Sequence, residues 1–358
     1  MISKISLSGM RALPAIEKQF SQGITVVSGK NGTGKTTLLE AIFLLCQGFS
    51  FRARNLNQLV PWADAESQTL IRGTLEHGDE ISERALLVTK SEITAKCDGK
   101  PLRSPTGFFG KFPAVMMQPS DIELVRDAPE VRRKWMDEIL CFLSPLNADL
   151  LKRYKRVLLQ RNEWLHQNKV GMATGGEQLF QILSEQLVSL GSKIWEQRFA
   201  LFERASKIIP EYYAKLTDGR DVISCSYRSA IYEDDNFEQK FHDLLQKNFD
   251  SERRMGTTLV GPHKDDFVIW SGDYEMRNFG SQGQCRSCAI SMRFAAVDIA
   301  CSNLLPPVLL LDDILAELDT DRRTAVSDII REKKCQVFVA TPRSEDMPFT
   351  PDDLISIG

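Results

Sequence analysis

Residues 29–36 are the sequence feature that most constrains the fold of this chain. They read Gly29, Lys30, Asn31, Gly32, Thr33, Gly34, Lys35 and Thr36, which fits the phosphate-loop pattern G-x-x-x-x-G-K-[ST]. The β-branched run GITVVSG precedes the loop and the helix-forming segment TTLLEAIFLLCQ follows it, which is the strand-loop-helix order that the motif requires. Glycines let several backbone N–H groups converge on phosphate oxygens at a helix N-terminus. The sequence therefore predicts an α/β fold that binds a nucleotide.

The end of the loop carries the chemistry. We expect Lys35 to reach the β- and γ-phosphates and the Thr36 hydroxyl to ligate Mg²⁺, with Thr37 next to them in the nucleotide-binding set. The alternative is a glycine-rich surface turn, which the flanking strand and helix disfavour. A phosphate loop alone leaves kinases, GTPases, helicases and transport-type ATPases open, so the rest of the chain has to decide among them.

A second motif lies far from the loop, in the run Pro307-Val308-Leu309-Leu310-Leu311-Asp312-Asp313. A short apolar run of this kind is typical of a buried strand, and it ends in two carboxylates. We expect Asp312 to hold the metal through water and Asp313 to orient or activate the attacking water. The alternative is a strand followed by a helix cap, which from this run alone is about as common.

Two further segments flank the acidic strand. Residues 281–284, Ser281-Gln282-Gly283-Gln284, open a helical segment, and residues 316–319, Ala316-Glu317-Leu318-Asp319, follow the strand. Together they look like the signature and D-loop of the ATP-binding-cassette ATPases. A helix N-terminus with the Ser281 hydroxyl and the Gly283 N–H suits an anion. Alone, S-x-G-Q would more often be a helix cap, but its place in the series favours the signature.

Within this class the chain closely resembles the RecF family of bacterial recombination-repair ATPases, which are related to the heads of the chromosome-maintenance (SMC) proteins. The resemblance covers nearly the whole chain. Its motifs, in chain order, are Met10-Arg11, residues 29–45, Ser50-Phe51-Arg52, residues 119–125, Arg132-Arg133 with Asp137, Gly261-Pro262-His263-Lys264-Asp265-Asp266, residues 281–284 and LLLDDILAELD. A transport ATPase would be expected to carry Asp-Glu and a switch histidine instead of Asp312-Asp313 and Thr341.

The resemblance implies an ATP-binding-cassette head, a phosphate-loop fold with a mixed sheet flanked by helices and an inserted helical lobe. It implies ATP and Mg²⁺ as cofactors, a homodimer formed with ATP, and a weak DNA-stimulated ATPase activity. It also implies duplex and gapped or junction DNA as partner and cooperation with RecO- and RecR-type proteins in loading RecA. Four more residues receive roles by family position: Gln118 at the metal and the γ-phosphate, Thr341 at the switch, and Arg11 and Asp319 at the nucleotide, with Ser281, Gly283 and Gln284 acting from the other subunit.

The chain divides into segments of different periodicity. Residues 68–100 alternate like a small antiparallel sheet, whereas residues 128–249 carry apolar residues at helical spacing, broken by glycines at 170–178. We therefore expect an ATPase lobe from residues 1–125 and 255–358, and a helical lobe from residues 126–254. The strand-like runs of the last hundred residues, residues 258–270 included, suit buried parallel strands.

Net charge limits how DNA can be bound. The 358 residues carry a formal charge of −3, so an anionic partner has to meet a local basic patch. Residues 131–161 hold eight basic and three acidic side chains, and the candidates for phosphate contact are Arg132, Arg133, Lys152, Arg153, Lys155 and Arg156. The alternative for this stretch is a solvated helix face.

Other functions are open at this stage. The ATP site could be structural in an SMC-type scaffold, or, with less support, the chain could drive a membrane transporter. We expect a cytoplasmic protein without membrane attachment, because no apolar run reaches the ~18–20 residues that cross a bilayer. Cys285 and Cys288 lack further ligands at metal spacing, and His263 has no nucleophile arranged around it, so we expect structural roles for these residues.

Overall fold

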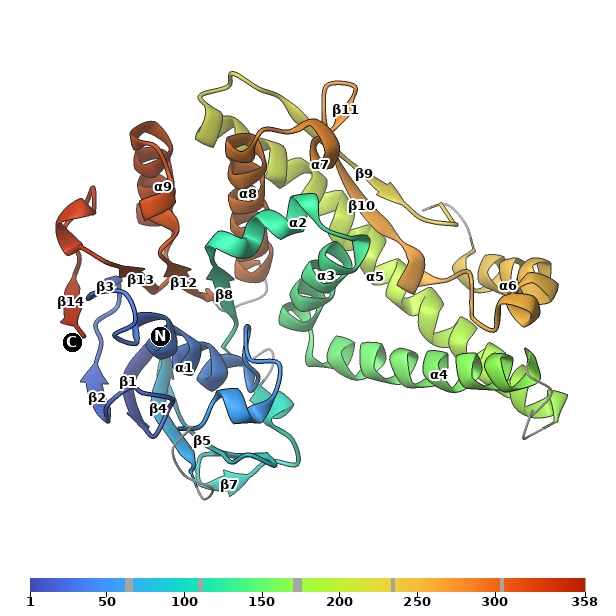
Figure 1. Ribbon diagram of the computed structural model, residues 1–358, viewed down its shortest axis with the longest axis horizontal. Coiled ribbons are helices and arrows are strands. Elements are labelled where there is room, and N and C mark those ends of the chain that lie inside the picture. The colour runs from blue at the N-terminus through green and yellow to red at the C-terminus, as the bar shows by residue number, and fades with distance from the viewer. Residues whose placement is uncertain (62–66, 109–111, 170–175, 233–235, 303–305, 358) are drawn as a thin grey trace. The chain divides into compact units, whose positions relative to one another are not determined.

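The computed structural model of the chain describes residues 1–61, 67–108, 112–169, 176–232, 236–302 and 306–357 (Figure 1). The chain forms two compact units. The first comprises residues 1–122, 212–220 and 286–358, and the second comprises residues 123–211 and 221–285. The division into an ATPase lobe and a helical lobe stays a prediction, and the units depart from it in three segments. Residues 123–125 and 255–285 lie in the second unit, and residues 212–220 lie in the first.

A five-stranded parallel sheet forms one layer of the first unit. Its order is β14 (Asp353–Ser356), β3 (Ile24–Ser28), β13 (Val337–Thr341), β12 (Val308–Asp312) and β8 (Ala114–Met117). All of these strands except β14 read as apolar runs, because they are buried on both faces. The parallel strands predicted from the phosphate-loop, PVLLLDD and CQVFVATP segments are confirmed. Beyond these, β14 and β8 complete the sheet.

An antiparallel sheet of six strands forms a separate layer of the first unit. Its order is β2 (Ile16–Gln19), β1 (Ile2–Ser8), β4 (Thr69–His77), β5 (Glu80–Val88), β6 (Ile93–Cys97) and β7 (Lys100–Pro101). The small antiparallel sheet predicted for residues 68–100 is thus confirmed, with turns at Gly78 and Gly99. Parallel and antiparallel strands fall into different sheets.

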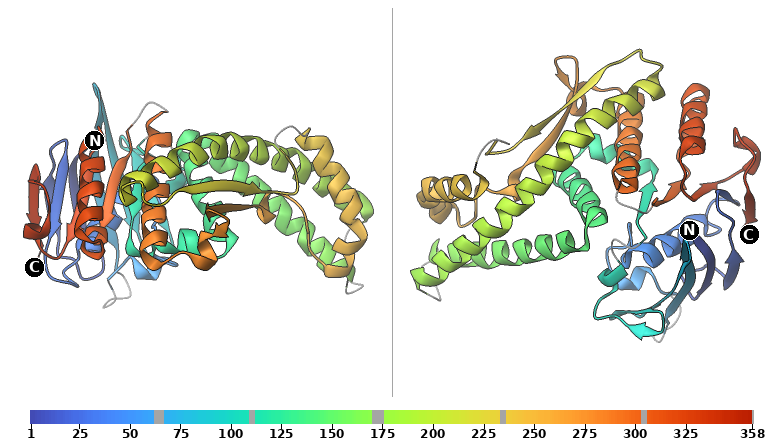
Figure 2. Two further views of the ribbon diagram at one scale, coloured as in Figure 1. Left: turned by 90° about the horizontal axis from the view of Figure 1, so that it is seen from above. Right: turned by 180° about the vertical axis from the view of Figure 1, so that it is seen from behind.

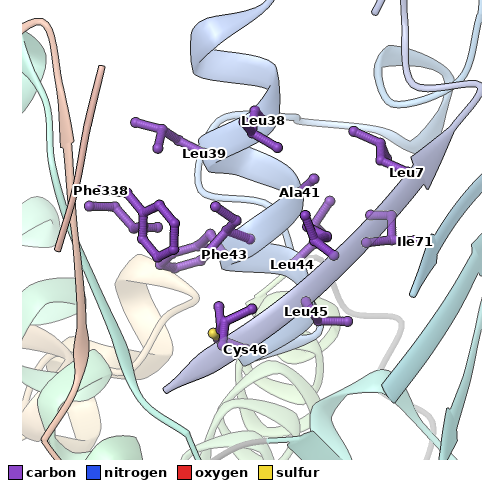
Figure 3. Close-up of a cluster of buried hydrophobic side chains, with 14 of the residues drawn as sticks. Leu7, Leu38, Leu39, Ala41, Phe43, Leu44, Leu45, Cys46, Ile71 and Phe338 are labelled. Atoms are coloured by element: carbon purple, nitrogen blue, oxygen red, sulfur yellow. The ribbon is translucent and has the colours of Figure 1, made fainter. Parts of the chain in front are cut away.

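Helix α1 (Lys35–Gln47) contributes to the core that both sheets share. Twelve of its thirteen residues are buried, so the helix is apolar on all sides, as a helix enclosed by the protein must be. In Figure 3, Leu44 and Leu45 face Leu7 and Ile71 of the antiparallel sheet, while Phe43 faces Phe338 of the parallel sheet. Burial of α1 fixes the loop at its N-terminus relative to the strand ends. The first unit also holds α9 (Thr320–Glu332) and much of α8 (Gln282–Cys301).

The second unit is mainly helical. Its helices are α2 (Glu123–Arg126), α3 (Pro129–Leu143), α4 (Pro145–Lys169), α6 (Phe237–Met255), α7 (Met276–Phe279) and most of α5 (Glu177–Thr217). The helical character predicted for residues 128–249 is confirmed except at residues 223–228, which form a strand. The predicted glycine break falls largely on residues 170–175, outside the described residues. Short 3-10 turns occur across the chain at Leu56–Gln58, Pro105–Phe108, Pro119–Ile122, Pro262–Lys264, Ile314–Glu317 and Ser344–Asp346.

A small antiparallel sheet completes the second unit and corrects one expectation. It has the order β11 (Tyr274–Glu275), β10 (Asp266–Ser271) and β9 (Ile223–Arg228). The run at residues 258–270 is therefore not a parallel strand. Only its end is extended, and that end pairs with β9, a strand inside the segment expected to be helical. Figure 2 shows β9 and β10 running along α5, where Phe199 and Tyr227 stack edge to face. Within the described ranges, no helix is long and apolar enough to span a membrane.

Candidate nucleotide site

The phosphate loop connects β3 to α1, and its backbone accepts only glycine at critical points. Gly34 has φ 111°, and a Cβ atom there would lie 2.4 Å from Leu13 Cδ1. Gly32 has φ 84° but open space around it, so only the backbone conformation requires glycine there. These conformations curl residues 29–34 into a loop at the head of α1. The curl is the form that lets backbone N–H groups face a phosphate.

The N-terminus of α1 is prepared for an anion. No side chain caps it, and its first turn holds no acidic residue. The first N–H groups of the helix and the positive end of its dipole are therefore available. Lys35 is 4% exposed, and its Nζ donates to the carbonyl oxygens of Gly29 at 2.8 Å and Lys30 at 3.2 Å. The backbone carbonyl groups of the loop thus hold the Lys35 ammonium group over the loop.

Oxygen ligands suited to Mg²⁺ meet beside the loop. The Thr36 hydroxyl donates to Asp312 Oδ1 at 2.8 Å, although the two residues are 276 positions apart. They meet because β3, β13 and β12 run parallel, so that their carboxyl ends reach the same edge of the sheet. Burial raises the pKa of Asp312, and the charge of Asp313 adds to this, whereas the Thr36 hydrogen bond lowers it. A hydroxyl and a carboxylate in contact are hard ligands that fit this metal.

Asp313 adopts an unusual conformation next to this pair. Its φ is 51°, a region that non-glycine residues rarely occupy, and its N–H donates to the Ala340 carbonyl at 3.2 Å. Its Oδ1 atom is buried and has no hydrogen-bond partner in the described part of the chain. Burial raises the pKa of Asp313, the Lys35 charge lowers it, and Glu317 raises it again. A carboxylate oxygen without a protein partner is available to accept a hydrogen bond from water.

Two more predicted residues lie at the same sheet edge. Met117 pairs with Leu311, so Gln118 follows β8 beside Asp312. The Gln118 N–H donates to Asp121 Oδ2 at 2.9 Å, and Arg293 of α8 pairs with that carboxylate at 2.6 Å. Thr341 ends β13, where its hydroxyl donates to the Arg343 carbonyl at 3.1 Å. The structure therefore brings Lys35, Thr36, Asp312, Asp313, Gln118 and Thr341 to one edge.

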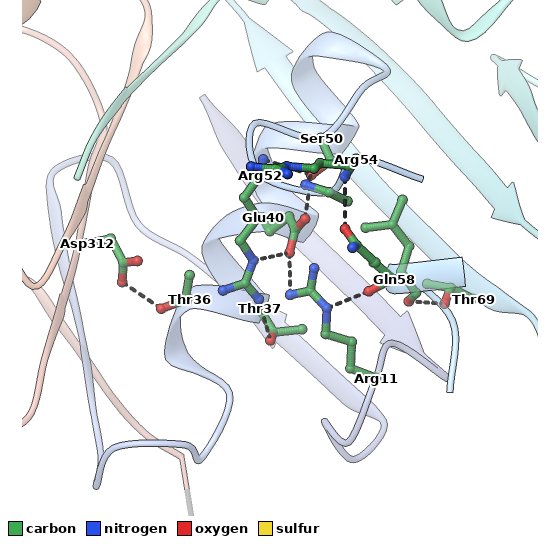
Figure 4. Close-up of polar contacts among 12 residues, drawn as sticks. Arg11, Thr36, Thr37, Glu40, Ser50, Arg52, Arg54, Gln58, Thr69 and Asp312 are labelled. Atoms are coloured by element: carbon green, nitrogen blue, oxygen red, sulfur yellow. Dashed lines mark hydrogen bonds and ion pairs between the residues drawn. The ribbon is translucent and has the colours of Figure 1, made fainter. Parts of the chain in front are cut away.

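Arg11 belongs to a charge cluster around the buried Glu40 of α1 (Figure 4). Its Nη1 lies 2.5 Å from Glu40 Oε2, and its Nε donates to the Gln58 carbonyl at 2.6 Å. Arg52 Nε donates to the same Glu40 oxygen at 2.9 Å, and an Arg52 nitrogen lies 3.5 Å from the Thr37 hydroxyl. Arg11 is thus paired with a carboxylate of its own chain. Sequence reasoning missed Glu40, although a carboxylate inside the apolar run TTLLEAIFLL was the available signal.

The signature segment lies at the start of α8 in the second unit. The Ser281 N–H donates to Gln284 Oε1 at 2.9 Å and the Gln284 N–H donates back to Ser281 Oγ at 3.2 Å, a reciprocal capping box. The other end of the Gln284 amide donates to Asp221 at 3.1 Å. Ser281 itself is exposed, and Gly283 lies in the same helical turn. Asp319, in the first unit, caps α9 by accepting from the Arg322 N–H at 2.9 Å.

The basic candidates for DNA contact divide into two groups. Lys152, Arg153, Lys155 and Arg156 are exposed on α4. Arg132, by contrast, is 3% exposed and pairs with Asp266 at 2.7 Å, and Arg133 donates to the Asp265 carbonyl at 2.7 Å. Arg132 therefore does not offer a free cation to a phosphate, which corrects that part of the prediction. A buried arginine needs an internal carboxylate, and its partner here is 134 residues away.

The G-P-H-K-D-D stretch forms the polar core of the second unit. His263 Nδ1 lies 2.7 Å from the Tyr154 hydroxyl, and burial lowers the pKa of His263 to about 4. Asp265 accepts from the Trp195 and Tyr227 side chains at 2.8 and 2.7 Å, and burial raises its pKa to about 6. These contacts indicate the structural role expected for His263, which lies in the second unit.

Comparisons with known proteins agree with this arrangement. The family model for the RecF/RecN/SMC N terminal domain matches residues 1–357. The DNA replication and repair protein RecF of Geobacter metallireducens is 34% identical over 95% of this chain and 92% of its own length, and that of Exiguobacterium sp. is 32% identical over the same shares. The chain belongs to the RecF family. Its relatives are DNA replication and repair proteins by name.

Solved structures extend the likeness of this RecF-family chain to the fold. A structure described as the recombination mediator protein RecF-ATP in the RecFOR pathway has a TM-score of 0.89 and 27% identity, covering 99% of this chain and 95% of that one. An SMC head domain from Pyrococcus furiosus has a TM-score of 0.57 at 19% identity, covering 99% and 92%. The predicted ATPase-head fold is therefore confirmed.

Proposed function

We propose that this RecF-family chain binds ATP with Mg²⁺, hydrolyses it slowly, and uses the bound nucleotide to join two copies on DNA during recombinational repair. The observation that supports this most directly is the contact between Thr36 and Asp312 at 2.8 Å, beside an Asp313 oxygen that has no hydrogen-bond partner in the described residues. The solved relative described as RecF-ATP supports the choice of nucleotide.

The residues of the loop divide the work of phosphate binding. N–H groups of residues 29–36 and the Lys35 ammonium bind the phosphate oxygens. Thr36 and Asp312 would hold Mg²⁺, which when bound neutralises phosphate charge. Asp313 accepts a hydrogen bond from the attacking water and orients it, with Gln118 and Thr341 at the same edge. Arg11 is held in the ion pair with Glu40, so contact with the nucleotide would require that pair to break. We therefore propose that Arg11 mainly stabilises the position of α1.

The nucleotide site is completed by a second copy. In cassette ATPases the signature acts on the γ-phosphate held by the other subunit, and we propose the same for Ser281, Gly283 and Gln284, with Asp319 near the joint. The capping box supports this proposal. In it Ser281 Oγ accepts a hydrogen bond from the Gln284 N–H, so the Ser281 O–H can still donate to a phosphate oxygen. ATP then closes the dimer and hydrolysis reopens it.

DNA binds through charge rather than through sequence-specific contacts. Lys152, Arg153, Lys155 and Arg156 give α4 an exposed basic surface that would neutralise backbone phosphates. We propose duplex and gapped DNA as the partner, and, from the RecFOR pathway of the solved relatives, RecO- and RecR-type proteins that load RecA in the cytoplasm. DNA stimulation of a weak ATPase follows if DNA favours the closed dimer.

The test is the ATPase rate and the sedimentation of the protein with ATP, each measured with and without gapped duplex. Wild type should dimerise with ATP and hydrolyse faster when DNA is added. Ser281→Arg should stay monomeric while it still binds ATP. Normal dimerisation of Ser281→Arg, or an ATPase rate indifferent to DNA, would count against the proposal.

A further inference from the structure

Two aromatic side chains are exposed in the second unit just before the signature. Tyr274 of β11 is 63% exposed and Phe279, the last residue of α7, is 71% exposed. Their rings contact each other edge to face with centroids 5.4 Å apart. Single exposed apolar side chains are ordinary, but adjoining large ones mark surfaces that bind a partner. Tyr274 and Phe279 are called the aromatic pair below.

The backbone that presents the aromatic pair is fixed. The Gly280 N–H donates to the Met276 carbonyl at 2.9 Å, and Arg126 donates to the Gly280 carbonyl at 3.2 Å. A Cβ atom at Gly280 would lie 2.7 Å from both Met276 Cγ and the Met276 carbonyl oxygen, and Met276 is fully buried. Phe279 therefore extends from a packed segment, so its exposure does not come from a loose turn. A pre-ordered aromatic side chain loses little conformational entropy when a partner covers it.

The short separation of Phe279 and Ser281 along the chain indicates what covers the aromatic pair. Phe279 precedes Ser281 by two residues, and two residues span at most about 7 Å. A macromolecule that packs onto Ser281 therefore comes within about 7 Å of the Phe279 backbone, close enough to cover its exposed ring. Under the proposed function, that macromolecule is the phosphate-loop face of a second copy of this chain.

We infer that Tyr274 and Phe279 form an apolar anchor that a second copy of this chain covers when ATP joins the two. The inference rests on the proposed function and adds to it a protein contact outside the nucleotide site. Aromatic residues at the centre of an interface are the ones whose truncation costs most. Phe279, nearer to Ser281 and more exposed, should matter more than Tyr274.

The experiment measures the dimer Kd of the full chain with ATP by sedimentation. Phe279→Ala should raise this Kd by at least about 30-fold, the change that truncation of an interface anchor produces, and Tyr274→Ala should raise it less. The matched control is Leu146→Ala on α4, because Leu146 is 78% exposed in the same unit and should leave the Kd unchanged. ATP affinity at dilutions where the chain is monomeric should be the same for all variants.

The outcomes distinguish a failure of the aromatic anchor from a failure of the proposed ATP-dependent dimer. If wild type does not dimerise with ATP, the proposed function fails and the inference with it. If wild type dimerises and Phe279→Ala matches it, the inference alone is overturned. A loss of ATP affinity in the dilute Phe279→Ala monomer would also overturn it, because the ring would then serve the nucleotide of its own chain.

Discussion

The carboxylate of Glu40 lies 2.5 Å from the guanidinium of Arg11, and no part of the Glu40 side chain is exposed. We predict that Glu40→Gln lowers the free energy of unfolding by about 2–4 kcal/mol, because breaking a buried pair leaves a cation without its counter-charge. Urea unfolding measures this. Glu17→Gln, which removes the partner of Lys4 at the surface, should leave the midpoint where it is. Equal effects of the two substitutions would contradict the structural role of Glu40.

Alanine substitution should reduce ATP binding to different extents at two glycines of the phosphate loop. At Gly34 an added Cβ would meet Leu13 at 2.4 Å in a backbone with φ 111°, whereas at Gly32 it would meet nothing within 4 Å. Gly34→Ala should therefore weaken ATP binding more strongly than Gly32→Ala does, because the backbone conformation is unfavourable for alanine and the Leu13 side chain must also shift. Gly32→Ala, which carries only a backbone cost of about 1–2 kcal/mol, should retain weaker binding. Titration with ATP by calorimetry distinguishes them, and the reverse order would count against the loop geometry.

Asp313→Asn tests the water-orienting residue. The amide cannot replace the buried carboxylate oxygen that has no partner within the described ranges, so kcat should fall by about 10²–10⁴-fold, the range for a positioned base. ATP affinity should change little. Asp328→Asn, at an exposed position on α9, is the matched control and should keep the wild-type rate. A normal rate in Asp313→Asn would remove this residue from the mechanism.

The nucleotide edge could be predicted because its parts obey local rules. The phosphate loop and the apolar strand before Asp312 each follow from short-range patterns, and parallel strands bring the strand ends to one edge. The sequence pattern did not reveal that Glu40 pairs with Arg11. The two residues are distant in the sequence, and only the folded chain brings them together.

The second unit shows the same limit. Arg132 looked like a surface cation in a basic helix, yet its partner is Asp266, 134 residues away. The strand β9 was hidden in a long helical stretch, because a short run such as ISCSYR gains its extended form from pairing with β10. Contacts that are distant in sequence override local propensity in both cases.

The polar core of the second unit predicts opposite pH effects for two residues. The pKa of His263 in the folded chain is about 4, below its usual 6.5. Folded protein then binds fewer protons than unfolded protein in this window, so the stability due to His263 is present above pH 6.5 and is lost as pH falls toward 4. The loss amounts to about 3 kcal/mol. His263→Asn should therefore flatten the acid decline in stability measured by urea unfolding.

Asp265 supplies the contrasting variant. Its pKa is raised from 3.8 to about 6, so its contribution is present below pH 3.8 and is lost as pH rises through 6. Asp265→Asn should thus steepen the rise of stability with pH, in the direction opposite to His263→Asn. A shift of both variants in the same direction would contradict the assigned environments.

The basic surface of α4 should carry salt-dependent DNA affinity. Replacing Lys152, Arg153, Lys155 and Arg156 by alanine should reduce the slope of log K against log salt by about 0.9 for each phosphate contact removed. Fluorescence anisotropy with duplex DNA at several salt concentrations measures the slope. Arg132→Ala should instead lower stability, because Arg132 is buried against Asp266. An unchanged slope in the α4 variant would place DNA elsewhere.

The most direct test of the shared nucleotide site is a mixing experiment with Lys35→Ala and Ser281→Arg. Each variant alone lacks one half of every composite site, whereas a mixed dimer has one complete site, built from the phosphate loop of the Ser281→Arg chain and the signature of the Lys35→Ala chain. Sedimentation with ATP should show association in the mixture and none in either variant alone. Wild-type association of Ser281→Arg alone, or none in the mixture, would contradict the account.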